Sequence, residues 1–125
     1  MKPTRRSLTR KLDLAWSELI RSRGKCQKCG KTETLQACHI FSRNQRTVRW
    51  NPLNGLCLCA GCHFHSHQNP ILFTQFVEKL LGDIRFNLLL KRAREVRKWQ
   101  LHEMESLLSE LESPQEDSLS MGRLR

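Results

Sequence analysis

The fold of this chain is decided by one stretch of its sequence, Cys59-Ala60-Gly61-Cys62-His63-Phe64-His65-Ser66-His67. In it, a Cys-x-x-Cys pair is followed at once by one histidine and, four residues further on, by another. Residues four apart share one face of a helix, so His63 and His67 can bind one divalent ion. His65 points off that face, and we expect it to face solvent or to contact phosphate. The stretch thus combines a structural knuckle with a metal-binding helix.

A second Cys-x-x-Cys pair, Cys26 and Cys29, lies about thirty residues upstream of Cys59 and Cys62. Two such knuckles predict a tetrahedral structural zinc site, which would stabilise a chain too short to bury a large core. A redox-active pair is the alternative, but no thioredoxin-like βαβ pattern surrounds either knuckle. Cys57 stands on an expected strand beside the cluster. We expect it to be a buried free thiol, with a ligand exchange with Cys59 as the alternative.

The 125-residue chain has the size of one small domain and a formal net charge of +10 at pH 7. Residues 1–31 and 82–101 are basic, whereas 102–125 are acidic. Basic surfaces attract phosphate-rich partners such as nucleic acids, although a solvated basic face is the plainer explanation. No run approaches the ~20 apolar residues of a membrane span, and no apolar signal segment follows Met1. We therefore expect a cytoplasmic protein whose cysteines stay reduced.

Hydrophobic periodicity and turn residues divide the chain into helices and short strands. In chain order we expect a basic arm at 1–8, a helix at 9–23, strands at 35–41 and 56–58, a well-buried helix at 70–81, one long helix at 83–112 and a disordered tail at 113–125. Residues 9–82 would form the domain, and the long helix would be appended to it. The apolar residues of that helix from Leu101 to Leu111 alternate in steps of three and four. They fit either a coiled-coil seam for a homodimer or a helix that packs back on its own domain.

His39 lies near the end of the first expected strand, flanked by Cys38 and Ile40, and Asn54 lies five residues before the second knuckle. A lone histidine in such a place is more often packed in a core than catalytic. The order His39, Asn54, His63 favours a catalytic role instead. A divalent ion held by His63 and His67 can act as a Lewis acid on a phosphate, while a separate imidazole deprotonates water. His39 is placed for that second task.

This order of residues resembles the HNH endonucleases, a family with a ββα-metal (His-Me finger) core. The likeness covers residues 26–67 and is carried by Cys38-His39-Ile40, by Asn54-Gly55-Leu56-Cys57-Leu58-Cys59 and by Cys62-His63 with His67. It implies an α+β fold with a structural zinc site and flanking helices, and metal-dependent hydrolysis of DNA phosphodiester bonds. It also implies that His39 is the general base, that Asn54 holds the loop and orients His39, and that His63 and His67 bind the catalytic metal.

Cys38 departs from the family pattern, which has Asp or His before the base histidine as a further metal ligand. A thiolate binds zinc and softer ions well but magnesium poorly. If Cys38 is a ligand, the catalytic ion is not magnesium; if it is not, His63 and His67 leave positions open for water and phosphate. We therefore expect a structural Zn2+ and a catalytic divalent metal, which is Mg2+, Mn2+, Ni2+ or Zn2+.

A wider pattern is similar to the phage NinG/Rap type of recombination nuclease. It consists of Asp13 to Ser17, Ile20-Arg21, the first knuckle, Arg49-Trp50-Asn51 and Asn54-Gly55. That similarity implies a phage-encoded enzyme that acts on branched recombination or replication DNA in the bacterial cytoplasm. We expect its binding to DNA to be either non-sequence-specific or structure-specific.

Five basic residues are expected to contact DNA: Arg43, Arg46, Arg49, Lys91 and Arg92. Trp50 fits either stacking on an unpaired base or half-buried packing. A noncatalytic zinc-ribbon DNA-binding module is the alternative function for the whole chain. An RNA-directed nuclease would use the same site.

Overall fold

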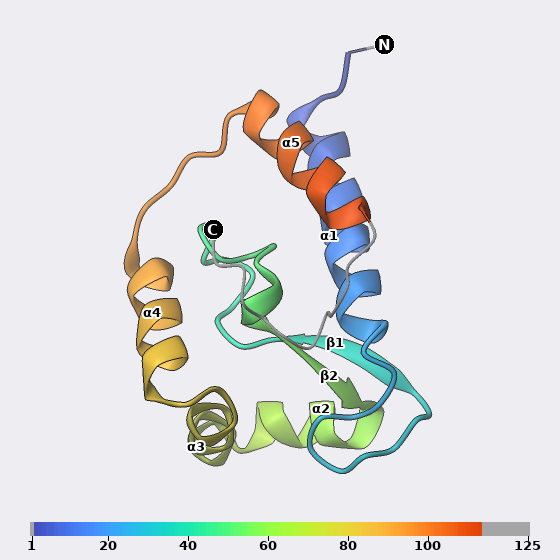
Figure 1. Cartoon of the computed structure of the whole chain (residues 1–125), viewed down its shortest axis with the longest axis vertical. Helices are drawn as coiled ribbons and strands as arrows, with labels where there is room; N and C mark the ends of the chain where they lie inside the picture. The colour runs from blue at the N-terminus through green and yellow to red at the C-terminus, as the bar shows by residue number, and fades with distance from the viewer. Residues whose placement is uncertain (1, 114–125) are drawn as a thin grey trace.

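A computed structural model describes residues 2–113 and confirms the expected α+β class. Its elements are α1 (Arg5–Arg21), β1 (Leu35–His39), the 3-10 helix η1 (Pro52–Asn54), β2 (Gly55–Cys59), α2 (Ala60–Gln68), α3 (Pro70–Leu81), α4 (Asp83–Arg94) and α5 (Leu101–Glu112). The hairpin of β1 and β2 followed directly by α2 is consistent with the expected ββα core (Figure 1). Except for Ser113, the tail expected at 113–125 lies outside the described residues.

The β1–β2 hairpin separates two hydrophobic cores. The strands are antiparallel, and alternate side chains of a strand face opposite sides of the sheet. Ala37 and Cys57 pack in the core formed with α1 and α5, whereas Cys38 and Leu56 pack in the core formed with α3 and α4. Figure 1 shows α1 with α5 on one side of the hairpin and α2 to α4 on the other. Neighbouring residues of β1 such as Ala37 and Cys38 therefore face two different groups of helices, whereas Leu35 packs against both cores.

Helix α1 begins at Arg5, four residues before the expected start. Thr4 and Ser7 form a capping box: the Thr4 hydroxyl accepts from Ser7 N–H at 3.1 Å, and the Ser7 hydroxyl accepts from Thr4 N–H at 3.0 Å. Serine here takes the place of the Glu or Gln that usually marks this motif. The last four residues of the expected basic arm are thus helical, and Leu8 is already buried.

The single long helix expected over 83–112 is wrong, because α4 ends at Arg94 and α5 begins at Leu101. The segment between them is held by contacts with distant parts of the chain. The Thr47 hydroxyl donates to the Glu95 carbonyl at 2.8 Å, and the buried Trp99 donates its indole N–H to the Arg46 carbonyl at 3.0 Å. These tertiary contacts override a helical pattern that contains no glycine or proline.

Helix α5 packs on α1, so the alternative in which it folds back on its own domain is confirmed. Met104, Leu107 and Leu111 are buried in the core shared with α1. Of the face offered as a dimer seam, Met104 and Leu111 are thus covered within the chain, whereas Leu101 is exposed. No helix among residues 2–113 is both long and apolar enough to cross a membrane.

Helix α3 lies where it was expected, but it is not well buried. Only Val77 and Leu81 are buried, whereas Ile71 and Leu72 are exposed. The buried pair joins the core on the α2 to α4 side of the hairpin.

Candidate functional site

The four cysteines of the two knuckles form one cluster. The Sγ atoms of Cys26, Cys29, Cys59 and Cys62 all lie within 4.8 Å of one another. Those of Cys29 and Cys59 are 3.7 Å apart, close to the ~3.8 Å between two ligands of a tetrahedron with zinc–sulfur bonds of about 2.3 Å. The donor set and its spacing fit a structural metal of the zinc type. Among residues 2–113 it is the one group of three or more Cys, His, Asp or Glu that could hold an ion.

Backbone N–H groups lower the pKa of two of these four thiols, Cys26 and Cys59. Burial alone would raise the pKa of Cys26, but backbone N–H groups, first that of Cys29, lower it to about 6. The N–H groups of Cys29 and Cys62 lie 3.5 Å from the Sγ atoms of Cys26 and Cys59 respectively. Thiolates are the form that binds metal, so these N–H groups favour binding at Cys26 and Cys59, whereas burial and the neighbouring thiols raise the pKa of Cys62 to about 12.

Cys57 lies outside the cluster, as expected of a buried free thiol. Its side chain packs in the core shared by α1 and α5, and burial raises its pKa. Cys59 and not Cys57 therefore provides the third sulfur of the group.

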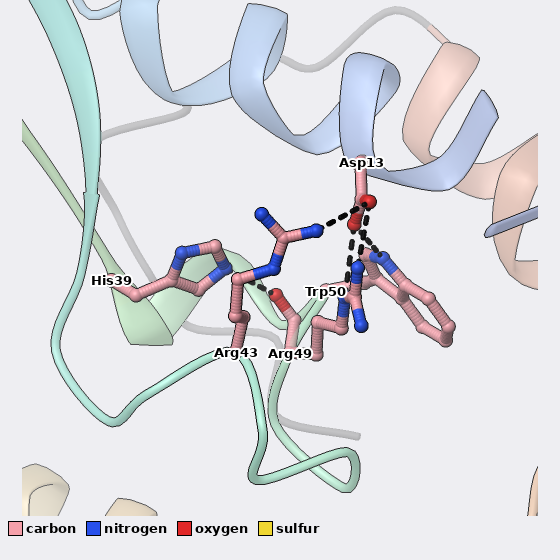
Figure 2. Close-up of polar contacts among 5 residues, drawn as sticks. All are labelled: Asp13, His39, Arg43, Arg49 and Trp50. Atoms are coloured by element: carbon pink, nitrogen blue, oxygen red, sulfur yellow. Dashed lines mark hydrogen bonds and ion pairs between the residues drawn. The ribbon is translucent and has the colours of Figure 1, made fainter. Parts of the chain in front are cut away.

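His39, the last residue of β1, is held in one orientation by two contacts. Its ring stacks on Trp16 with 3.9 Å between centroids and 10° between planes. Its Nε2 lies 3.0 Å from the backbone carbonyl of Arg49 (Figure 2). A carbonyl only accepts, so Nε2 carries the hydrogen and Nδ1 is the basic nitrogen. Burial lowers the pKa of His39 below its usual value, which favours the neutral ring.

Asn54 fastens the two residues that follow His39. It is fully buried, and its amide Oδ1 accepts from Phe41 N–H at 2.7 Å while its Nδ2 donates to the Phe41 carbonyl at 3.0 Å. Its backbone carbonyl accepts from Ile40 N–H at 2.9 Å. The chain leaving β1 is thus bound at both consecutive residues by one asparagine.

His63 and His67 lie together on α2, with 5.0 Å between their ring centroids. The Nδ1 of His63 is 2.8 Å from the Oε1 of Gln36 on β1. If Nδ1–H donates to this oxygen, Nε2 keeps a free lone pair, the arrangement typical of a metal-binding histidine. Burial and then the neighbouring His67 lower the pKa of His63, so its unprotonated form is favoured.

Cys38 faces α2 but is a core thiol. Its Sγ is buried and lies 3.9 Å from the Ser66 hydroxyl, and burial raises its pKa to about 11. Strand alternation places Cys38 on the α2 side of the hairpin and the adjacent His39 on the α1 side. The structure thus brings His63 and His67 together. Within residues 2–113 it does not gather Cys38 or His39 with them into a three-ligand group.

The five residues expected to contact DNA differ in how far their side chains are exposed to solvent. Arg43, Arg46 and Lys91 are exposed, and Arg92 is half-buried. The side chain of Arg49 is only 14% exposed. It is bound to Asp13 through two hydrogen bonds, Nε to Oδ1 at 3.0 Å and Nη2 to Oδ2 at 2.7 Å. Arg49 is therefore committed to an internal ion pair.

Trp50 is packed in the interior. Of the two explanations offered for it, stacking on a base or packing, the structure favours packing. It is 4% exposed, meets Trp99 edge-on with 5.7 Å between ring centroids, and donates its indole N–H to Asp13 at 2.8 Å. A ring so enclosed does not stack on an unpaired base. His65, by contrast, is exposed on α2 as expected and borders a shallow pocket beside Lys28.

Three residues at this site carry contacts that the sequence did not reveal: Asp13, Trp16 and Gln36. Asp13 and Trp16 were visible only as part of a motif on the first helix. Their spacing of three puts them on one helix face, but nothing local indicates that this face lies against His39.

Comparison with known proteins finds one family. Residues 26–74 match the family model described as HNH endonuclease. No curated protein and no solved structure gives a significant match to the chain. The resemblance seen in the sequence is thereby confirmed for the segment that contains both knuckles and the ββα hairpin and helix, and it supports a nuclease-type function.

Proposed function

We propose that this chain, whose residues 26–74 match the family model of the HNH endonucleases, is a metal-dependent enzyme that hydrolyses DNA phosphodiester bonds with His39 as the general base. The observation that carries the proposal is the orientation of the His39 imidazole. Its Nε2–H is committed to the Arg49 carbonyl, so the lone pair of Nδ1 is left to take a proton from water.

The residues around His39 have distinct tasks in this mechanism. Asn54 holds Ile40 and Phe41, so the chain directly after the base cannot shift when DNA binds. A neutral imidazole accepts the proton of the attacking water at Nδ1 and keeps its Nε2–H bond to Arg49 throughout. The His39 ring thus gains one hydrogen and one positive charge without changing its position.

His63 and His67 are the residues that would hold the catalytic divalent ion. Gln36 would fix the ring of His63, because a carbonyl oxygen on Nδ1 directs Nε2 outward. When bound, such an ion stabilises the negative charge on the phosphate and on the leaving oxygen. Two imidazoles leave positions for water and phosphate, and Mg2+, Mn2+, Ni2+ and Zn2+ are the ions to compare. Cys38 is left out of this assignment, because no three-ligand group among residues 2–113 includes it.

We further propose what kind of DNA this enzyme cleaves and in which cell it acts. Exposed Arg43, Arg46 and Lys91 supply charge for the DNA backbone, which gives affinity without reading sequence. The wider pattern of Asp13 to Ser17 and Arg49 to Asn51 supports branched recombination or replication DNA as the substrate and a phage-encoded enzyme in a bacterial cytoplasm. The four-cysteine cluster would carry Zn2+.

Cleavage assays test the proposal directly. Purified protein is incubated with plasmid, linear, branched and RNA substrates, first with chelator and then with each of the four ions. We expect metal-dependent cleavage of DNA that His39→Ala reduces at least a hundredfold, the lower range for a positioned general base. His102→Ala, at an exposed histidine on α5, serves as the matched control. No cleavage with any ion, or full activity of His39→Ala, would overturn the proposal.

The replacement of the usual ligand by Cys38 favours one second candidate, a noncatalytic zinc-ribbon DNA-binding module. That protein would bind DNA equally well as wild type and as a variant carrying both His39→Ala and His63→Ala, and it would cut none of the substrates. Faster cleavage of matched RNA than DNA strands would instead indicate an RNA-directed nuclease.

A further inference from the structure

We infer that Asp13 and Trp16, on one face of α1 and outside the segment that matches the family, are positioning residues for His39. The inference rests on the proposed function, because it assigns their role through the general base. Neither residue is placed to meet DNA, since Trp16 is buried and the Asp13 carboxylate accepts four hydrogen bonds, from Arg43, Arg49 and Trp50.

Asp13 holds both residues that flank the peptide group bound to His39. The Arg49 carbonyl that receives the His39 Nε2–H belongs to the peptide between Arg49 and Trp50. Asp13 accepts two hydrogen bonds from the Arg49 guanidinium and one, at 2.8 Å, from the Trp50 indole (Figure 2). With the side chains on both sides fixed to one carboxylate, this peptide cannot rotate its carbonyl away from the imidazole.

Trp16 restricts the same imidazole from its face. A nearly parallel stack at 3.9 Å leaves the His39 ring free to move only within its own plane. The indole is itself fixed, because its N–H donates to the Asn51 carbonyl at 2.9 Å in the buried core. Asp13 controls the nitrogen that is bound and Trp16 controls the plane of the ring. Together they determine where Nδ1 points.

The Asp13 carboxylate stays charged in this role. Burial alone would raise its pKa, but the hydrogen bonds from Arg49 and Trp50 and the charges of Arg49 and Arg43 bring it below the usual value. Arg43 approaches the same carboxylate at 3.4 Å but is largely exposed. Removing the negative charge would therefore loosen Arg49 while leaving Arg43 more available to DNA.

A measurement without DNA or catalytic metal tests the inference first. Nitrogen-15 NMR of the zinc-loaded protein reports which ring nitrogen of His39 carries the hydrogen. We expect the Nε2–H tautomer in wild type and in Glu18→Gln, which changes an exposed acid on the same helix. Asp13→Asn should give a mixture of tautomers, and Asp13→Glu should restore the single form in part. A pure Nε2–H tautomer in Asp13→Asn would overturn the inference.

Kinetic measurements then test whether Asp13 affects catalysis through His39. We expect Asp13→Asn to lower kcat about tenfold, as for other residues that orient a catalytic group through a partner, with KM unchanged or lower. In a His39→Ala background the same substitution should cause no further loss, because the residue through which it acts is gone. An equal loss in both backgrounds, or a rise in KM alone, would contradict the inference.

Two further variants keep the test decisive. If Asp13→Asn lowers the melting temperature sharply, Arg49→Lys removes the two-bond contact while keeping the charge, and Trp16→Phe keeps an aromatic face. Each should lower kcat without raising KM, and unchanged kcat in both would overturn the inference. Failure of the proposed function looks different: wild type does not cleave, or His39→Ala cleaves normally, whatever tautomer the NMR spectra show.

Discussion

Gly55 lies directly opposite His39 in the β1–β2 register, and its lack of a side chain lets α1 cross the hairpin at that point. A Cβ at position 55 would fall 2.5 Å from Ile20 Cδ1 and 2.7 Å from Trp16 Cζ2. No real Cβ tolerates such contacts, so the glycine is required by the close approach of the helix. The stack of Trp16 on His39 depends on this approach.

Gly55→Ala should therefore destabilise the fold and slow cleavage together. Overpacking a buried contact costs about 1–3 kcal/mol, and here the shift displaces the indole that supports His39. Chemical unfolding and single-turnover cleavage measure the two effects. Gly61→Ala is the control, because a Cβ on that exposed glycine of α2 meets nothing within 4 Å. If both variants behave alike, the close approach of α1 is not what Gly55 provides.

Cys59→Ser should abolish the structural metal site, whereas Cys57→Ala should leave it intact. Loss of one thiolate opens the tetrahedron, and in a small domain metal binding and folding are coupled. Elemental analysis of wild type should give one zinc per chain from this cluster, and Cys59→Ser should lack it and unfold at a lower temperature. Cys57→Ala should retain the zinc and lose about 1 kcal/mol for a small buried truncation. A full zinc complement in Cys59→Ser would contradict the assignment.

The contribution of Asp13 to stability should disappear in acid. Its pKa is lower in the folded protein than in the unfolded chain, where it is about 3.9. The stabilisation is therefore complete above that value and is lost as the pH falls through the folded pKa. Urea unfolding of wild type and Asp13→Asn should differ at pH 7, and the difference should shrink below about pH 4. Zinc loss in acid affects both proteins, so the difference isolates the carboxylate; a gap that stays constant down to pH 3 would refute this.

Trp99→Ala should release the connection between α4 and α5. The buried indole donates to the Arg46 carbonyl and meets Trp50 edge-on, and truncating a buried Trp costs about 3–5 kcal/mol. Unfolding experiments measure that loss, and hydrogen exchange should show faster exchange at residues 95–100. Val96→Ala is the control, since Val96 is fully exposed in the same segment and should change stability by less than about 0.5 kcal/mol. Equal losses in the two variants would show that Trp99 is not the anchor.

The local parts of the molecule were the predictable ones. The two knuckles, the hairpin and the position of α3 follow from ligand spacing, strand alternation and an Asn-Pro start, all of which act over a few residues. The break between α4 and α5 was missed because Thr47 and Trp99 make it through partners about fifty residues away, with no breaker in the segment itself.

In the candidate site, too, local features were predictable and long-range contacts were not. The sequence placed His63 and His67 on one helix face and His39 at the end of a strand, and the structure has them there. It could not reveal that Arg49 is bound to Asp13 with only 14% of its side chain exposed, or that Trp16 lies on the His39 ring. Such contacts depend on how α1 crosses the hairpin, which no spacing along the chain encodes.

The packing of α5 on α1 joins the two ends of the described chain, and both helices lie outside residues 26–74. On this side of the hairpin, α1 packs against both strands and α5 packs on α1. Residues 26–74, which match the HNH endonuclease family, therefore lack the helices that cover this side of the hairpin. A fragment cut to the family boundaries would carry every expected metal ligand, yet it would expose the back of the sheet on which they depend.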